Sequence, residues 1–216
     1  VKTIQQSLQL ASEHEDARGV IANHYLVLAM LSLEMGDDEA AEAYFEKGIA
    51  LADQSTLVDT PYRSQLVQAR LKDVQGKLNA ALNLLDEAKR FYVESPIPNT
   101  RPVEALKARI YLKQGQLSKA WDWVREQKLS VNDEISYLRE FEHITLARVW
   151  IAAYRGNQEE DRLSDALHLL ERLLNAADAE NRTGSLIEIL IVQALAHEAR
   201  GDISAALGPL KRALKL

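Results

Sequence analysis

Five segments of the 216-residue sequence share one pattern of turn-forming, small and apolar residues. The pattern is clearest in "GKLNAALNLLDEAK", which starts at Gly76, and in "GDISAALGPLKRAL", which starts at Gly201. The five segments start at residues 36, 76, 115, 161 and 201, so that successive starts are 40, 39, 46 and 40 residues apart. A nearly fixed period of this length is typical of stacked repeat proteins, in which each repeat is one supersecondary unit.

Each repeat is predicted to be a pair of helices joined by a tight turn. A glycine that ends the first helix can adopt the left-handed conformation that helix C-termini often require. The predicted turns lie near Gly36, Gly76, Gly115, Gly156 and Gly201. In the fourth repeat, an apparent insertion from Asn157 to Asp161 accounts for the longer spacing. The second helices are expected to begin at residues with good N-cap side chains, namely Asn79, Ser118, Ser164 and Ser204.

Small and large residues recur behind each turn at spacings that suit a close helix crossing. Five residues after each start stands an alanine, and nine residues after it stands a large apolar side chain. The alanines are Ala41, Ala81, Ala120, Ala166 and Ala206, and the large residues are Phe45, Leu85, Val124, Leu170 and Leu210. An alanine lets two helices approach closely, and the residue four positions later lies on the same helix face.

This pattern resembles the tetratricopeptide repeat, in which small residues and a glycine mark the crossing as Ala69, Gly76 and Ala81 do here. The period is about 40 rather than about 34, and Tyr111 is the one conspicuous aromatic anchor of a first helix. The sequence therefore predicts an all-α fold, a right-handed superhelix of helix-turn-helix repeats that forms a single domain over residues 1–216. Because residues 4–11 already look like the middle of a repeat, we expect the chain to be a piece of a longer protein.

Composition argues against several functional classes. The sequence has no cysteine, no phosphate-binding loop motif and no paired metal-ligand histidines, so we expect no enzymatic activity, no metal site and no cofactor. The formal net charge of −6, without any run of basic residues, argues against direct nucleic-acid binding. The longest apolar run, Tyr25 to Leu33, is too short to span a membrane. With no signal peptide and no cysteine, a cytoplasmic location is expected.

The first helices of such repeats line the concave face of the superhelix, where ligands usually bind. Six residues before each turn glycine, the five repeats carry Met30, Arg70, Arg109, Trp150 and Leu195. Guanidinium groups beside an indole ring suit anionic or sugar-like ligands and peptide carboxylates. Arg70, Arg109 and Trp150 are therefore the candidate ligand- or partner-binding residues. The alternative is a solvated helix face that carries scattered arginines.

The last third of the sequence resembles a more specific group of proteins. The pieces that carry this resemblance are "LARV" at Leu146 to Val149, "LLERLL" at Leu169 to Leu174, "RTGS" at Arg182 to Ser185 and "IEILIVQALA" at Ile187 to Ala196. Their order and spacing are similar to those in the repeat region of MalT-like regulators of the LuxR type. Arg148 and Arg182 are the polar residues within these pieces, and a structural role is the favoured interpretation for both.

The resemblance implies an effector-sensing and protein-interaction domain of a multidomain bacterial transcriptional activator. Its partners would be a small-molecule effector or another protein, and self-association would involve the full-length protein. The ATP-binding and DNA-binding modules of such regulators lie outside this stretch. The alternative interpretation is a stand-alone adaptor that binds protein partners through its repeats.

Overall fold

The computed structural model describes residues 2–11, 17–52, 57–93 and 98–216. These residues form eleven α-helices and one short 3-10 helix, and no strand occurs among them, which confirms the all-α prediction. The chain divides into two compact units, Val1–Pro96 and Ile97–Leu216, which are described separately. The prediction of one superhelix over residues 1–216 concerns the arrangement of these units and stays a prediction. None of the described helices is long and apolar enough to cross a membrane.

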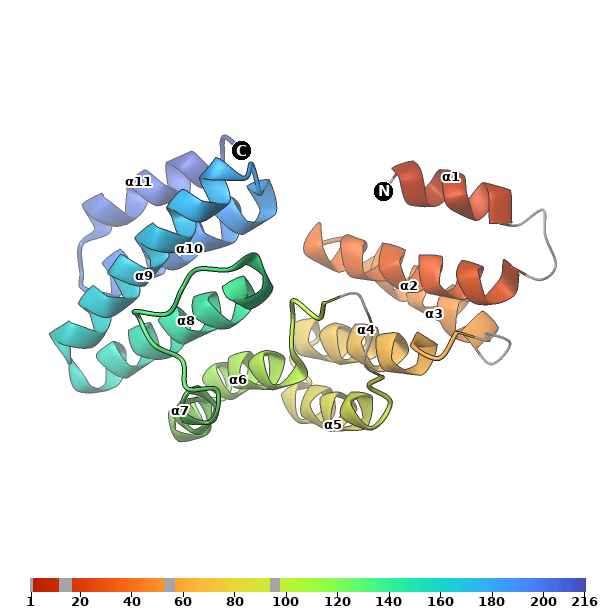
Figure 1. Ribbon diagram of the computed structural model, residues 1–216, viewed down its shortest axis with the longest axis horizontal. Coiled ribbons are helices and arrows are strands. Elements are labelled where there is room, and N and C mark those ends of the chain that lie inside the picture. The colour runs from red at the N-terminus through yellow and green to blue at the C-terminus, as the bar shows by residue number, and fades with distance from the viewer. Residues whose placement is uncertain (1, 12–16, 53–56, 94–97) are drawn as a thin grey trace. The chain divides into compact units, whose positions relative to one another are not determined.

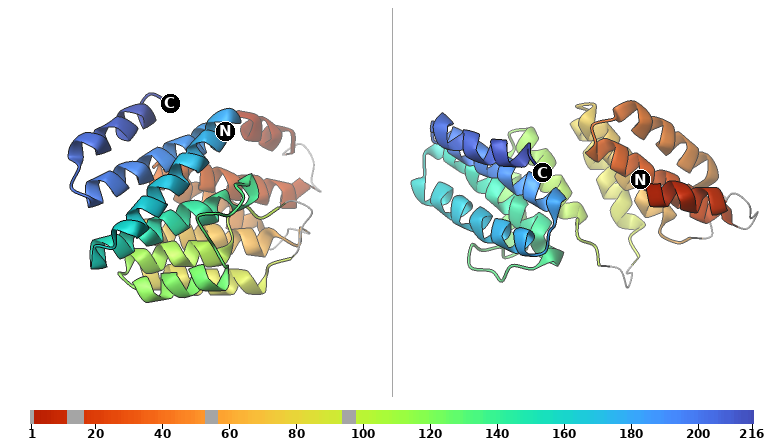
Figure 2. Two further views of the ribbon diagram at one scale, coloured as in Figure 1. Left: turned by 60° about the vertical axis from the view of Figure 1, so that its left-hand side comes forward. Right: turned by 90° about the horizontal axis from the view of Figure 1, so that it is seen from above.

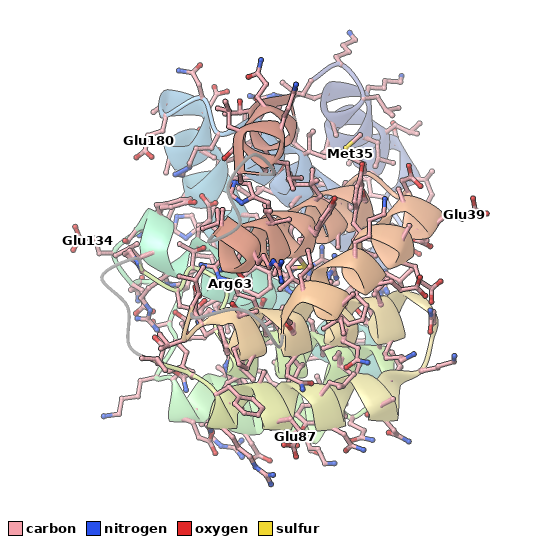
Figure 3. All side chains as sticks on the ribbon, turned by 90° about the vertical axis from the view of Figure 1, so that its right-hand side faces the viewer. Met35, Glu39, Arg63, Glu87, Glu134 and Glu180 are labelled. Carbon is pink, nitrogen blue, oxygen red and sulfur yellow. The ribbon has the colours of Figure 1, made fainter. Side chains whose placement is uncertain are left out.

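The first unit consists of a short helix followed by two helical hairpins (Figure 1). Its helices are α1 (Lys2–Ala11), α2 (Arg18–Glu34), α3 (Asp38–Ala52), α4 (Thr60–Val74) and α5 (Leu78–Arg90). Helix α2 packs against α3, helix α4 packs against α5, and α4 also contacts both helices of the preceding hairpin. Charged side chains such as Glu39 project from these helices into solvent (Figure 3).

The second unit contains three hairpins stacked side by side (Figures 1 and 2). Its elements are α6 (Val103–Lys113), α7 (Leu117–Glu126), η2 (Tyr137–Arg139), α8 (Glu140–Asn157), α9 (Glu160–Ala179), α10 (Thr183–Ala199) and α11 (Ile203–Ala213). The first helices of successive hairpins contact one another, α6 with α8 and α8 with α10. Helix α10 also packs against α9. Helix α8 therefore lies at the centre of this unit, and most of its residues are buried.

Four of the five predicted turn glycines have the conformation that the sequence requires of them. Gly36, Gly76, Gly115 and Gly201 all have φ between 70° and 83°. At each of them the next residue donates a backbone hydrogen bond to the carbonyl five residues earlier, as from Lys77 N to Lys72 O at 2.8 Å. This bond is the mark of the Schellman motif, which satisfies carbonyl groups at a helix end.

The fourth turn lies two residues later than predicted. Gly156 is part of α8, which continues to Asn157, and the left-handed residue is Gln158 with a φ of 58°. The predicted starts of the second helices also need correction. Helices α5, α7 and α11 begin one residue before Asn79, Ser118 and Ser204, and α9 begins at Glu160, four residues before Ser164. The cap of α11 is instead Asp202, whose carboxylate accepts a hydrogen bond from Ala205 N at 2.8 Å.

The alanines at the predicted helix crossings are buried in both units. Ala41 and Ala81 in the first unit and Ala120 and Ala166 in the second are fully buried, and Ala206 is nearly so. Of the large residues four positions later, Leu85, Val124 and Leu170 are buried, Phe45 is partly buried and Leu210 is 38% exposed. The repeat register deduced from the sequence is therefore correct, and the exposure of Leu210 marks the last hairpin as different.

Two glycines that looked alike in the sequence are expected to respond oppositely to substitution by alanine. Gly76→Ala should lower the free energy of unfolding by about 1–2 kcal/mol, because a Cβ atom is disfavoured in the left-handed conformation. Gly156→Ala should raise it by about 0.5–1 kcal/mol, because this glycine is helical and a Cβ atom there meets nothing within 4 Å. Urea denaturation followed by circular dichroism measures both changes. Equal effects of the same sign would contradict the assignment of the fourth turn to Gln158.

Candidate functional site

Arg109 is the centre of a polar cluster on the first helices of the second unit. Its Nε donates to Thr145 Oγ1 on α8 at 2.8 Å, and its Nη1 donates to Glu188 Oε1 on α10 at 2.6 Å. The guanidinium carbon lies 3.7 Å from the centre of the Phe141 ring. The Thr145 hydroxyl in turn donates to the Phe141 carbonyl at 2.7 Å. One side chain from α6 thus lies across α8 and reaches α10.

A second arginine shares the same carboxylate. Arg148 of α8 donates from Nη2 to Glu188 Oε1 at 3.4 Å. Its Nε is buried and has no hydrogen-bond partner among the described residues. Two guanidinium groups therefore face one carboxylate, and the cluster formed by Arg109, Arg148 and Glu188 carries one excess positive charge. Planar guanidinium groups bind carboxylates and phosphates through paired hydrogen bonds.

Burial and charge perturb the titration of two members of this cluster. Burial lowers the pKa of Arg109 to about 10, an effect that the charge of Glu188 partly offsets and that of Arg148 reinforces. Burial alone would raise the pKa of Glu188, but the charges of Arg109 and Arg148 outweigh it and hold this pKa below its usual value. At neutral pH Arg109 and Glu188 are therefore both ionised.

Arg70 occupies the corresponding position in the first unit and has a similar role. Its Nη2 lies 3.5 Å from Glu34 Oε1 on α2, and its Nη1 lies 3.4 Å from Asp73 Oδ2 on its own helix. The arginine thus joins the first helices of two successive hairpins. Arg70 and Arg109 belong to different units, and binding of a ligand at either of them stays a prediction.

Trp150 does not present its indole ring to a ligand, which corrects the sequence-based assignment. Its side chain is only 4% exposed and belongs to the core of the second unit. Its counterpart in the last hairpin, Leu195, is 36% exposed. The position six residues before the turn faces a following helix where one is present, because α10 packs against α8. We therefore remove Trp150 from the candidate site.

Arg182 of the "RTGS" segment makes a second link between α8 and α10. Its Nη2 lies 2.7 Å from Glu140 Oε2, and the Ser185 hydroxyl donates to the other oxygen of the same carboxylate. The Arg182 guanidinium carbon also lies 5.4 Å from the centre of the Tyr137 ring. Since Glu140 is nearly fully buried, this ion pair fixes where α10 begins relative to α8. The geometry agrees with a structural role for Arg182.

The loop between α7 and η2 is held against α8 and α9 by further polar contacts. Arg172 of α9 donates to the carbonyls of Val131 and Asp133. The Asp133 carboxylate lies 3.2 Å from Nε2 of His143, whose side chain is fully buried. Burial would raise the pKa of Asp133, but hydrogen bonds from Ser130 N and His143 hold it below its usual value. These contacts position a loop, and among the described residues no group of three acidic or histidine side chains could hold a metal ion.

Two members of the cluster were not singled out from the sequence. Glu188 comes from α10 and Thr145 from α8, and both reach Arg109 over sequence separations of 79 and 36 residues. The separation of 36 residues is close to the repeat period, so a comparison of adjacent repeats could have found Thr145. Glu188 lies two hairpins away from Arg109, and only the packing of α6, α8 and α10 brings it near.

Comparison with known proteins identifies the family. The sequence matches the family described as the MalT-like TPR region over residues 1–216, which is the whole chain. The chain belongs to this family. It is therefore a MalT-like helical-repeat region, and the resemblance inferred from the last third of the sequence extends to all of it. No curated protein matches the chain.

A solved structure also resembles this MalT-like repeat region. The crystal structure of BtubC (BKLC) from P. vanneervenii aligns with a TM-score of 0.51 over 99% of this chain and 86% of that chain. The two sequences are 16% identical, so the similarity concerns the fold alone. It agrees with an all-α arrangement of tetratricopeptide-like hairpins.

We expect the Arg109 cluster to make this MalT-like region less stable at low pH. Since the pKa of Glu188 is lowered on folding, its contribution to stability is complete above the ordinary pKa of 4.5 and is lost as the pH falls below it. Glu188→Gln should lower the free energy of unfolding at pH 7 by about 1–3 kcal/mol, because it leaves two arginines without their carboxylate. The variant should also lose less stability than the wild type between pH 6 and about pH 3.

The matched control is Glu198→Gln on the same helix. Glu198 pairs with Arg155, and both side chains are about half exposed, so this substitution should have little effect on stability. Urea denaturation at several pH values measures both variants. An equal effect of the two substitutions would show that the Glu188 pair contributes no more than a surface ion pair.

Proposed function

We propose that this chain is the effector-sensing and partner-binding repeat region of a multidomain bacterial transcriptional activator of the MalT-like, LuxR type. Membership of the MalT-like family over the whole chain supports this proposal. In such a protein, ATP binding and DNA binding belong to other modules, and the repeats supply the surface that an effector or a partner protein recognises.

We propose that a small anionic effector binds the cluster formed by Arg109, Arg148 and Glu188. The observation that carries this proposal is that two guanidinium groups share one carboxylate oxygen, at 2.6 Å and 3.4 Å. The side chains are 20–29% exposed, so a ligand can reach them from solvent. A phosphate or carboxylate group would neutralise the excess positive charge of the cluster.

Effector binding at this cluster would change the contacts between helices. Glu188 is the group through which Arg109 of α6 is joined to α10. An anion that competes with Glu188 for the two arginines would weaken that connection and favour a different packing of the first helices. A ligand shifts such an equilibrium by as much as its affinities for the two states differ. The flanking modules of the parent protein would then respond to the altered repeat region.

A thermal-shift screen of phosphorylated sugars, dicarboxylates and neutral oligosaccharides tests the effector proposal. We expect an anionic compound to raise the melting temperature of the wild type and of Arg155→Gln but not that of Arg148→Gln. Arg155 is the matched control, because it also lies on α8 and pairs with a glutamate of α10. The proposal fails if only neutral compounds stabilise the protein, or if Arg148→Gln responds as the wild type does.

We also propose that the region has no enzymatic activity, needs no cofactor, does not bind DNA itself and resides in the cytoplasm. Its acidic charge supports the absence of DNA binding. Retention of duplex DNA at physiological salt would contradict that part of the proposal. The coding sequence on either side of this chain distinguishes an activator from a stand-alone adaptor. An activator requires a nucleotide-binding module before the repeats and a helix-turn-helix after them.

A further inference from the structure

A third arginine lies next to the cluster of Arg109, Arg148 and Glu188. Arg101 stands just before α6, and this residue is exposed. Its guanidinium carbon lies 5.5 Å from the centre of the Phe141 ring, and that of Arg109 lies 3.7 Å from the same point. Two guanidinium groups therefore lie around one aromatic ring of α8.

Arg101 is close enough to the cluster to change the titration of its members. Burial is the main cause that lowers the pKa of Arg109 to about 10, and the charges of Arg148 and Arg101 add to its effect. Burial alone would raise the pKa of Glu188, but the charges of Arg109 and Arg148 hold it below its usual value. The charge of Arg101 acts in the same direction. A negative charge bound at the cluster is therefore within the electrostatic reach of three guanidinium groups.

The Phe141 ring fixes the place where these groups meet. Phe141 is only 8% exposed and belongs to the core of the second unit, so its ring is held by packing. A guanidinium group within about 6 Å of a ring centre is attracted to the ring. An arginine that is already held near its binding position loses less conformational freedom when a ligand arrives.

An effector of this cluster has to compete with Glu188, whose carboxylate Arg109 and Arg148 already bind. Because α10 tethers this carboxylate beside the two arginines, its effective concentration there is high. An effector with one negative charge would exchange one carboxylate for another and gain little. A second negative charge beside Arg101 would add a charged contact to those that Glu188 loses.

We propose that the effector is a small dianion, with one anionic group at Arg109 and Arg148 and its second negative charge beside Arg101. Arg101 is then the residue that selects dianions over monoanions. This inference rests on the effector proposal made above for the same cluster and names the class of ligand. Short dicarboxylates and phosphate monoesters share the required chemistry, since guanidinium groups bind both through paired hydrogen bonds.

The experiment compares dianions with monoanions of nearly the same shape. The first set of probes is malonate, succinate and glutarate, each with its monoamide. The second set is glycerol phosphate and its methyl phosphodiester. Isothermal titration calorimetry of the full chain at about pH 8 measures the dissociation constants, because a phosphate monoester loses its second proton at about pH 6. Sodium chloride keeps the ionic strength equal for all probes, since salt screens exposed charges.

The protein variants are Arg101→Gln and the matched control Arg125→Gln. Arg125 lies on α7 of the same unit, where it pairs with Asp122, and its side chain is 69% exposed. Both substitutions remove one positive charge from an exposed residue, so the control separates a local contact from an effect of net charge. Circular dichroism checks that both variants are folded.

We expect the wild type and Arg125→Gln to bind at least one dianion at least about tenfold more tightly than its monoanionic counterpart. In Arg101→Gln this preference should fall below about threefold, whereas binding of the monoanion should be unchanged. A preference found only in the first set identifies the effector as a dicarboxylate, and one found only in the second identifies it as a phosphate monoester.

The inference and the effector proposal fail in different ways. If none of the probes binds the wild type, both fail. If monoanions bind the wild type as tightly as dianions do, the cluster binds anions but does not select dianions, and only the inference is wrong. The same conclusion follows if Arg101→Gln keeps the full preference, or if Arg125→Gln loses it to the same extent.

Discussion

Replacement of Trp150 by alanine is expected to lower the free energy of unfolding of the second unit by about 3–5 kcal/mol. The indole ring is buried in the core between the stacked hairpins, and its removal leaves a cavity that neighbouring side chains cannot fill without rearrangement. Trp121 and Trp123 remain in the same unit. Their fluorescence therefore follows urea unfolding of the second unit in the variant as well.

The control for this prediction is Leu195→Ala, at the same repeat position in the last hairpin. Because Leu195 is partly exposed, its truncation removes less buried apolar surface and should cost much less than that of Trp150. If Trp150→Ala lowers the free energy of unfolding as little as Leu195→Ala does, Trp150 does not pack in the core and is again a candidate binding residue.

Leu85→Ala is expected to have the largest effect in the first unit, a loss of about 2–5 kcal/mol in the free energy of unfolding. Leu85 is 2% exposed and lies one turn after Ala81, at the crossing of α4 and α5. The reverse change, Ala81→Leu, increases the side-chain volume at the crossing. It should lower the free energy of unfolding by about 1–3 kcal/mol, because the helices cannot separate to accept the larger side chain.

Circular dichroism during urea denaturation measures these variants, since all three tryptophans lie in the second unit. The conservative control is Leu85→Met, which keeps most of the volume and should cost less than about 1.5 kcal/mol. Denaturation midpoints that remain at the wild-type value for both Leu85→Ala and Ala81→Leu would mean that the crossing is assigned to the wrong residues.

The hairpins could be predicted because the residues that form each turn and helix crossing lie close together in the sequence and recur from repeat to repeat. An alanine at the crossing and a large residue one turn later recur in every hairpin, and a glycine with a positive φ recurs in four of the five turns, so comparison among repeats finds them. The fourth turn was misplaced because Gly156 tolerates a helical conformation as well as a left-handed one, and Gln158 takes the left-handed position instead. The N-caps were misplaced because the helices begin before the serine and asparagine side chains that suggested them.

The candidate site was harder to predict than the fold. Repeat offset placed Arg109 correctly on a first helix, but the same offset placed Trp150 in a site although it packs in the core. The same repeat position can be buried or exposed. It is buried where another hairpin packs against it and exposed where no following hairpin is described. Repeat spacing places Glu188 on a first helix but could not pair it with Arg109, because their contact joins two helices that have α8 between them.

The central position of α8 determines how the second unit opens. Helix α8 contacts α6, α7, α9 and α10, so its backbone amides can exchange with solvent only when several neighbours separate at once. Helix α11 packs against α10 at the edge of the unit, and Pro209 within it leaves the Ala205 carbonyl without the N–H group that would otherwise bind it. Hydrogen exchange should therefore be slowest in α8 and fastest in α11, so that the second unit opens first at its last described helix.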